Sequence, residues 1–277
     1  MKGRITSCRW RRKTAGLLAI AAAAGGPACS PATAIEGDSG RSRLFIGNSL
    51  TSANELPAMV ALIGAAAHDT VRVAAVAGPN LALIDHVDGA TDAVAQIGRG
   101  GWTFVVLQQG PTPAGICRDT LVLAAMRLGP RLRSAGARAA LFLPWTRRGF
   151  PQSLEAAGES AALASRAVGG VVAPIGIAWR EALAADPSAP LYASDGYHPA
   201  PAGTLLAALT LYDRLFRRDV RDIPVESLAN LPALRLTPAQ VRGLAEAAHA
   251  ASADWPADPP TPVPADTTRH SAGGGPC

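Results

Sequence analysis

The sequence predicts a doubly wound α/β domain, in which helices flank a mostly parallel sheet. Two observations predict this class. The chain has 277 residues, of which 48% are hydrophobic and 17% charged, and this is enough to bury one large core. Short apolar runs alternate along the chain with longer stretches that are apolar on one face only, as in repeated β-α units.

The apolar runs mark the expected strands, which we place at residues 44–46, 71–77, 103–107, 139–143 and 171–174. The amphipathic stretches mark the expected helices, at residues 54–67, 118–135, 153–167, 177–185, 200–216 and 237–251. From residue 254 to residue 277 the chain is rich in Pro, Thr, Gly and Ala, which is typical of a disordered tail. The folded domain is therefore expected to span residues 35–253.

The first 34 residues are typical of a secretory signal peptide. Basic residues precede an apolar run at 15–24, and small residues follow up to Ala34, where we expect cleavage. The run is too short to cross a bilayer, and no later segment keeps about 18 uncharged apolar residues together. We expect an exported protein, periplasmic or extracellular, without a transmembrane segment.

The export route is less clearly marked than the signal itself. Arg11 and Arg12 form a twin-arginine pair, but the residues after the pair fit that pattern poorly. Cys29 is a candidate lipid acceptor, yet the residues before it lack the expected leucine, so a lipid anchor is the minority interpretation. After cleavage only Cys117 and Cys277 remain, so we expect no disulfide framework and interpret Cys117 as a small buried residue.

The net charge of +5 comes from the signal segment. Six of the 26 basic residues lie in the first 34 residues, where no acidic residue occurs, and without them the chain carries 20 basic and 21 acidic residues. A nucleic-acid partner is therefore not expected. No lysine follows Lys13, which excludes Schiff-base chemistry and a phosphate-binding P-loop lysine from the mature chain.

Two short motifs together predict a serine hydrolase. Ser49 follows the first apolar run and precedes a helical stretch, so its hydroxyl is expected at a strand-to-helix turn. A serine hydroxyl is a weak nucleophile at neutral pH and needs a base, which in turn needs an orienting group. About 145 residues later, Asp195 and His198 are spaced so that the carboxylate can bind one ring nitrogen while the other faces Ser49.

Each motif alone has an ordinary structural interpretation, Ser49 as a helix N-cap and Asp195-Gly196 as a turn. Their joint occurrence favours catalysis, because all candidate residues are expected at one edge of the sheet. Ser49 follows the first strand, Gly78 to Asn80 follow the second, and Gln108-Gln109 follow the third. Ligands of open α/β sheets bind at the carboxyl ends of the strands.

Gly47-Asn48-Ser49-Leu50 resembles the first sequence block of the SGNH (GDSL-like) hydrolases, with Asn48 in the usual Asp position, and the segment from Asp195 to Pro199 resembles their last block, Asp-x-x-His. The similarity runs from about residue 43 to about residue 216. It implies a flavodoxin-like three-layer fold with Ser49 as nucleophile, Asp195 as orienting acid and His198 as base. It implies no metal and no organic cofactor.

The resemblance also implies an oxyanion hole, normally built from the serine N–H, a glycine N–H after the second strand and an asparagine side chain after the third. Here the middle blocks differ. Pro79 has no N–H, so the second donor is expected to be Gly78 or Asn80. In the third block Gln108 or Gln109 replaces the asparagine, and the sequence does not choose between them.

Three other groups of residues have both a functional and a structural interpretation. Asp85-His86 could form a second acid-base pair or a metal site, but no further ligand has suitable spacing, so a surface or loop role is favoured. Trp102, Trp145 and Trp179 could line a sugar-binding cleft, although at least two are expected in the core. Arg147-Arg148 could contact an anionic substrate group or belong to a solvated loop.

The expected function is an exported serine esterase that hydrolyses carboxylic esters through an acyl-enzyme. The expected substrate is a small-molecule or glycan ester, for example an O-acetylated glycan. Two alternatives stay open. One is a non-catalytic glycan or cell-envelope binding module with the same fold, and the other is an acyltransferase that uses the same three side chains.

Overall fold

A computed structural model describes residues 42–110 and 115–256 of the chain. Its centre is a five-stranded sheet in which every strand pairs in parallel, in the order β2-β1-β3-β4-β5. The strands are β1 (Ser42–Gly47), β2 (Arg72–Ala77), β3 (Phe104–Gln108), β4 (Arg138–Phe142) and β5 (Val171–Ala173). This order is the flavodoxin-like one, with the strand order reversing between β1 and β3. The predicted fold class is confirmed.

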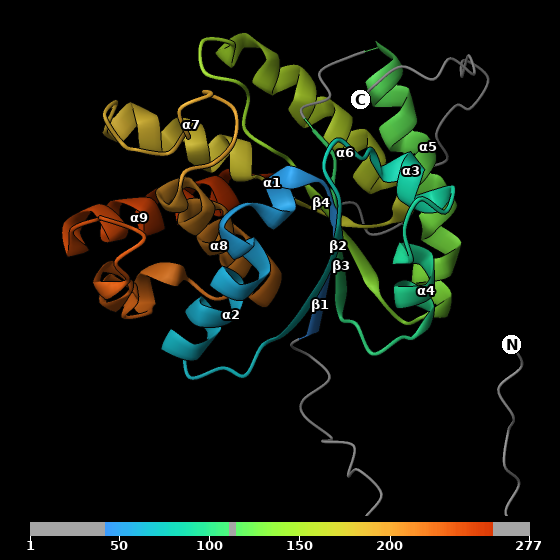
Figure 1. The fold of residues 1–277 in the computed structure, drawn as a ribbon, viewed down its shortest axis with the longest axis horizontal. Helices are drawn as coiled ribbons and strands as arrows, with labels where there is room; N and C mark the ends of the chain where they lie inside the picture. Colours follow the sequence, from blue (N-terminus) through green and yellow to red (C-terminus); the bar gives the residue numbers. More distant parts are fainter. Residues whose placement is uncertain (1–41, 111–114, 257–277) are drawn as a thin grey trace, which may run out of the picture. The chain divides into compact units, whose positions relative to one another are not determined.

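Helices cover both faces of the sheet (Figure 1). One layer contains α2 (Leu56–Ala66), α7 (Ile175–Ala185), α8 (Pro201–Phe216) and α9 (Pro238–Asp254). The opposite layer contains α3 (Leu83–Val87), α4 (Ala93–Gly98), α5 (Gly115–Ser134) and α6 (Leu154–Val168). The molecule therefore has three layers, helix, sheet and helix.

Successive side chains of each strand point to opposite faces of the sheet, and this divides the core into two clusters. In β1, Phe45 packs in the cluster under α2 and α8, whereas Leu44 and Ile46 pack in the cluster under α5 and α6. All six residues of β1 are buried because neighbouring strands cover its edges and helices cover its faces. Burial on both sides explains why the central strands are continuous apolar runs.

The predicted strands and long helices lie within a few residues of their observed bounds. Short elements were missed, namely α1 (Ser49–Ser52), α3, α4 and the 3-10 helices η2 (Ala53–Glu55), η3 (Pro151–Ser153), η4 (Val220–Asp222) and η5 (Val225–Asn230). They are too short to show an amphipathic period. The predicted signal peptide and most of the predicted tail lie outside the described residues, and α9 ends at Asp254.

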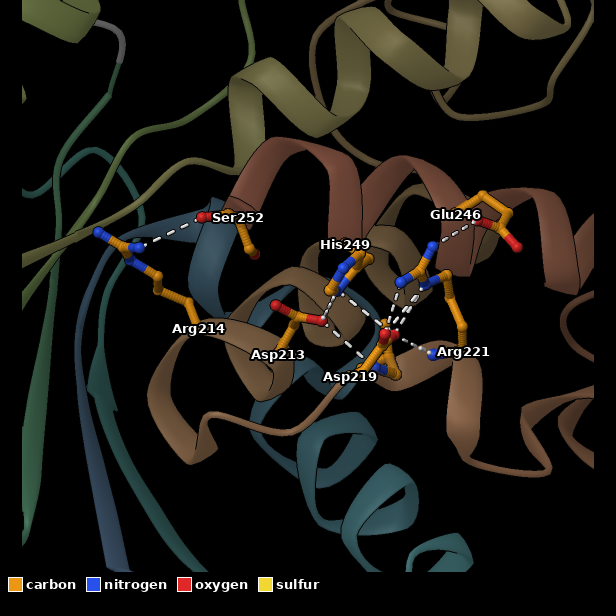
Figure 2. A network of polar contacts seen from close by, with 8 residues as sticks. Asp213, Arg214, Asp219, Arg221, Glu246, His249 and Ser252 are labelled. Atoms are coloured by element: carbon orange, nitrogen blue, oxygen red, sulfur yellow. Dashed lines mark hydrogen bonds and ion pairs between the residues drawn. The ribbon is translucent and has the colours of Figure 1, made fainter. Parts of the chain in front are cut away.

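A polar network fastens the last helices together (Figure 2). His249 Nδ1 on α9 lies 2.9 Å from Asp213 Oδ2 on α8 and 3.3 Å from Asp219, which caps η4. Arg221 pairs with Asp219 at 2.6 Å and with Glu246 of α9 at 3.6 Å. The ion pair with Arg221 lowers the pKa of Asp219 to about 2, whereas burial raises the pKa of Asp213.

Asp213, Asp219 and His249 also lie close enough together to hold a cation, since one ligand atom from each falls within 4.8 Å of the others. The guanidinium of Arg221, however, already supplies positive charge to Asp219. We therefore interpret the cluster as a structural clamp between α8, η4 and α9. Among the described residues, no helix combines the length and the apolar character needed to span a bilayer.

Candidate active site

The turn after β1 presents Ser49 at the carboxyl edge of the sheet. Asn48 caps α1, because its side-chain oxygen accepts a hydrogen bond from the N–H of Leu50 at 3.1 Å. Ser49 is therefore the first residue of the helix, and its own N–H needs no partner inside the helix. The capping role that the sequence left open for Ser49 belongs to Asn48.

Ser49, His198 and Asp195 lie in one chain of hydrogen bonds. Ser49 Oγ lies 3.0 Å from His198 Nε2, and His198 Nδ1 lies 2.6 Å from Asp195 Oδ2. With Asp195 ionised, Nδ1 carries the proton, so Nε2 is free to accept from the serine hydroxyl. The structure thus brings together the three side chains that the sequence singled out, although they lie almost 150 residues apart.

The loop between α7 and α8 orders the carboxylate of Asp195. Its Oδ1 accepts the backbone N–H groups of Tyr197 at 2.9 Å and of His198 at 3.0 Å. The hydrogen bond from His198 and that from the Tyr197 N–H hold the pKa of Asp195 at about 2, although the side chain is exposed. Asp195 therefore remains a carboxylate over the whole range in which a serine hydrolase would work.

Contacts between the two segments fix the distance from serine to histidine. Asn54, five residues after Ser49, donates from Nδ2 to the carbonyl of Pro199 and to Thr204 Oγ1, both at 2.9 Å. On the other side, Trp145 Nε1 donates to the carbonyl of Tyr197 at 2.8 Å. His198 is thus anchored to the segment that carries Ser49 and to the loop after β4.

The carbonyl of Gly47, two residues before Ser49, is held from two directions. It accepts from the N–H of Gly78 at 3.2 Å and lies 3.0 Å from His86 Nε2. His86 is fully buried, and its Nδ1 lies 2.8 Å from Thr91 Oγ1. Because Gly47 offers only an acceptor, Nε2 must carry the proton and Thr91 must donate to Nδ1.

His86 is thus neither a surface residue nor one of a second acid-base pair. Burial lowers its pKa, which favours the neutral ring that this arrangement requires. Asp85, its neighbour, accepts from the backbone N–H of Ala82 at the start of α3. A structural role for Asp85-His86 was the correct interpretation, but the predicted surface position was wrong, since the imidazole is buried beneath the turn that carries Ser49.

The candidate oxyanion donors are not equally available. The N–H of Gly78 is engaged by the Gly47 carbonyl. Asn80 has a left-handed backbone, φ 59°, at the third position of a turn closed by the hydrogen bond from Leu81 N–H to the Gly78 carbonyl at 3.4 Å. Asn80 is exposed, and among the described residues neither its N–H nor that of Ser49 has a hydrogen-bond acceptor. Of the candidate backbone donors, these two N–H groups remain open.

Both glutamines of the third block bind the scaffold. Gln108 Oε1 accepts from the N–H of Asn48 and from Thr51 Oγ1, each at 2.8 Å. Gln109 accepts from the N–H of Leu83 at 3.0 Å and donates to the carbonyl of Cys117 at 3.2 Å. Both side chains are buried, and the oxygen of Gln108 supports the turn that carries Ser49. The Nε2 of Gln108 is also buried and has no hydrogen-bond partner among the described residues.

The three tryptophans belong to the interior. Trp102 is 7% exposed, and Trp145 and Trp179 are each 1% exposed. Trp145 stacks on Trp179 with ring centroids 3.9 Å apart. The core interpretation therefore holds for all three, and no sugar-stacking surface is formed by them.

The expectation for Cys117 was wrong, because this residue is half-buried and disulfide-bonded. Every other cysteine lies outside the described residues.

Known structures share this architecture. No model of a protein family matches the sequence, and no curated protein matches it. A protein from Slackia heliotrinireducens, provisionally assigned to the SGNH hydrolases, is 27% identical over 62% of this chain and 97% of its own, with a TM-score of 0.54. The chain has the fold of the SGNH hydrolases. The likeness, together with the matching sequence blocks, supports a hydrolase of the SGNH type.

Two further structures show the same fold at lower identity. A DUF4886 family protein from Bacteroides uniformis is 17% identical, with a TM-score of 0.64 over 77% of this chain and 95% of its own. An alpha/beta hydrolase enzyme from the metagenome of Lake Arreo, Spain, is also 17% identical, with a TM-score of 0.50 over 64% of this chain and 96% of its own. At this identity the two likenesses concern the SGNH fold alone.

Sequence reasoning missed the residues that support the site. Asn54 has a left-handed backbone, φ 49°, and an Asn just before Leu56-Pro57 is a turn signal that could have marked it. The acceptor role of Gln108 and the contact from His86 to Gly47 left no signal in the sequence. Both depend on which strands lie side by side.

Proposed function

We propose that the protein is a serine esterase that hydrolyses carboxylic esters through an acyl-enzyme intermediate. The observation that carries the proposal is the hydrogen-bonded chain from Ser49 Oγ through His198 to the Asp195 carboxylate, at 3.0 and 2.6 Å. Its position at the carboxyl edge of the sheet, where α/β folds bind ligands, supports the same conclusion.

The chemistry follows the geometry of the three side chains. Ser49 Oγ attacks the ester carbonyl while its proton passes to His198 Nε2. The bond from the carbonyl carbon to the alcohol oxygen then breaks, and His198 returns the proton to the departing alkoxide. In the second half, water loses a proton to His198 and attacks the acyl carbon. The bond from the acyl carbon to Ser49 Oγ then breaks, His198 returns the proton to Oγ, and the acid is released.

Negative charge develops on the carbonyl oxygen during each attack. The open N–H of Ser49 and the open N–H or side-chain amide of Asn80 are the donors that we assign to this oxygen. Gln108 and Gln109 are assigned a supporting role, because both side chains are buried and their Oε1 atoms accept from the N–H groups of Asn48 and Leu83. Removal of one oxyanion donor typically costs about 3 kcal/mol of transition-state stabilisation.

The substrate that we propose is an exposed ester such as an O-acetyl group on a glycan. The side chains of His198 and Asp195 are 39% and 48% exposed, so the catalytic groups face solvent and a bulky alcohol part can approach them. We also propose that the protein is exported to the periplasm or beyond the cell. The support for export is the composition of residues 1–34.

Hydrolysis of 4-nitrophenyl acetate and labelling by a serine-directed phosphonate test the proposal. The purified protein should turn over the ester and acquire one covalent phosphonate, and both reactions should be lost in Ser49→Ala. Ser52→Ala, in the last position of α1, is the matched control and should retain both. No turnover and no labelling would instead support the binding module, and ester exchange onto a sugar acceptor would identify a transferase.

A further inference from the structure

The loop after β4 carries two adjacent arginines beside the catalytic loop, by which we mean the segment between α7 and α8 that carries Asp195 and His198. Arg147 and Arg148 are exposed and line a hollow of about 510 Å³. The catalytic loop supplies the facing wall, which includes Asp195 and Gly196. Phe150 adds an apolar ring that is 54% exposed. The hollow therefore adjoins the acid of the triad and combines positive charge with an apolar surface.

The position of the arginines relative to the catalytic loop is fixed by hydrogen bonds. The N–H of Arg148 donates to the carbonyl of Gly196 at 2.8 Å. Tyr192 donates its hydroxyl to the carbonyl of Thr146 at 2.8 Å, from the segment that leads into the catalytic loop. Motion of the arginine loop away from the triad would break these two hydrogen bonds. The bonds therefore hold the backbone of the arginine loop at a fixed position beside the triad.

In the part of the chain that the structure describes, no carboxylate neutralises either guanidinium. Within residues 42–110 and 115–256, ion pairs engage surface arginines such as Arg127, Arg180 and Arg221, but none engages Arg147 or Arg148. The two cations instead lie over aromatic rings, Arg147 over Tyr197 at 5.5 Å and Arg148 over Tyr192 at 5.0 Å. Stacking orients a guanidinium and leaves its N–H groups free for an anion.

Asp195 does not need this charge. Its pKa of about 2 follows mainly from the hydrogen bonds of His198 and the Tyr197 N–H. The positive charge beside the hollow is therefore not explained by support of the triad. An anion brought by the substrate is the remaining partner that this chemistry fits.

The placement also indicates which part of an ester would carry the anion. His198 must protonate the departing alkoxide, so the alcohol part of the ester lies on the side of the catalytic loop. The oxyanion donors that we assign, Ser49 and Asn80, lie on the turns after β1 and β2. The hollow is lined by the catalytic loop, so it accepts the alcohol part rather than the acyl group.

We propose that Arg147 and Arg148 form a subsite for an oxyanion, a carboxylate or a sulfate, on the alcohol part of the ester substrate. This inference rests on the proposed esterase function. The substrate class is then an ester of an acidic alcohol, such as an acylated acidic sugar. Both anions present oxygen pairs that match the fork of a guanidinium.

Matched aryl acetates test the subsite. The esters 4-acetoxybenzoate and 4-acetoxybenzenesulfonate carry the two anions on the alcohol part, and 4-acetoxybenzamide is the neutral reference of similar size. A second pair uses larger esters, the charged acetylated oligogalacturonate and the neutral acetylated xylo-oligosaccharide. This pair tests whether the anion binds farther from the ester bond than an aryl ring extends. The measured quantity is the ratio of kcat/KM for the charged ester to kcat/KM for the neutral one, at low salt and at 0.5 M NaCl.

The proposal expects this ratio to fall about tenfold in Arg147→Gln/Arg148→Gln for at least one pair, mainly through KM, and to fall in the unmodified protein at high salt. The neutral esters should be hydrolysed at unchanged rates. Arg131→Gln/Arg133→Gln removes the same charge from exposed positions near the end of α5, remote from the catalytic edge, and should leave every ratio unchanged.

An unchanged ratio in the Arg147/Arg148 variant, for both the aryl and the oligosaccharide pairs, overturns the subsite while neutral turnover leaves the esterase proposal intact. A fall in neutral turnover equal to the fall in charged turnover also overturns it, because the arginines would then act on the triad itself. Absence of turnover for all esters would refute the esterase function, and the subsite with it.

Discussion

A single methyl group at residue 47 tests how the nucleophile turn is supported. In Gly47→Ala the new Cβ would lie 2.4 Å from Gln108 Oε1 and from Thr51 Oγ1, and 2.9 Å from Gln108 Cβ. An ordinary contact begins at 3.4 Å, so the side chain of Gln108 or the turn itself must move by about 1 Å. Because Gln108 Oε1 accepts the N–H of Asn48, either movement disturbs the residue next to Ser49.

Two effects set the expected magnitude. Overpacking of a well-filled site costs about 1–3 kcal/mol, and a buried amide that loses its acceptor costs about another 1–3 kcal/mol. We expect Gly47→Ala to lower the free energy of unfolding by about 2–6 kcal/mol, the sum of the two effects. A displacement of about 1 Å at the nucleophile is expected to lower kcat by about 100-fold, with a much smaller change in KM.

The assay combines chemical denaturation with the hydrolysis of 4-nitrophenyl acetate. Gly243→Ala is the matched control, because a Cβ at this exposed position of α9 meets no atom within 4 Å and its backbone is helical. The control should be fully active and more stable by roughly 0.5–1 kcal/mol, since alanine favours the helix. Wild-type stability and kcat in Gly47→Ala would refute the close packing on which the reasoning depends.

Two further predictions concern titratable residues. His86→Leu should lower kcat about tenfold without changing KM, whereas His86→Gln, whose amide can donate to Gly47, should restore it. Burial lowers the pKa of His86 from 6.5, so its folding contribution is present above pH 6.5 and falls by up to about 1.4 kcal/mol per pH unit below it. Denaturation midpoints that fall equally with pH in the wild type and in His86→Gln would contradict this. For Asp219 the pKa of about 2 lies below the ordinary 3.8, so the stabilisation is present above pH 3.8 and lost towards pH 2. Asp219→Asn should therefore be less stable by about 1 kcal/mol at pH 7 and equal to the wild type near pH 2, and a constant difference would rule this out.

The sequence was sufficient to predict the sheet, because burial makes a strand visible. Strands such as β1 and β3 are covered on both faces and so consist of apolar residues throughout. The long helices were visible for the same reason, through one apolar face each. Helices of four to six residues, such as α1 and α3, complete too few turns for a period to appear, and hydrogen bonds of caps and turns define them instead.

The proximity of Ser49, Asp195 and His198 could be predicted because each lies in a short local motif. Asp195 and His198 are close in sequence, so their contact depends mainly on one turn. Ser49 is recognisable from the strand before it and the helix after it. The supporting residues lack such local signals, since His86 reaches Gly47 from 39 residues away and Asn54 reaches Pro199 from 145 residues away.

The third block could not be interpreted from the sequence for a more specific reason, because a glutamine amide has both a donor end and an acceptor end. From the sequence, Gln108 can donate to an oxyanion or accept from the backbone, and nothing local decides between them. The register explains the acceptor role of Oε1: Ile46 pairs with Leu107, so Gln108 follows beside Gly47, where the missing side chain leaves room for its Oε1 under the Asn48 N–H. The Nε2 of the same amide has no partner among the described residues. Gly47 and Gln108 are therefore one structural unit divided between two motifs. A longer residue at 47 and a glutamine at 108 exclude each other, so the two blocks have to be interpreted together.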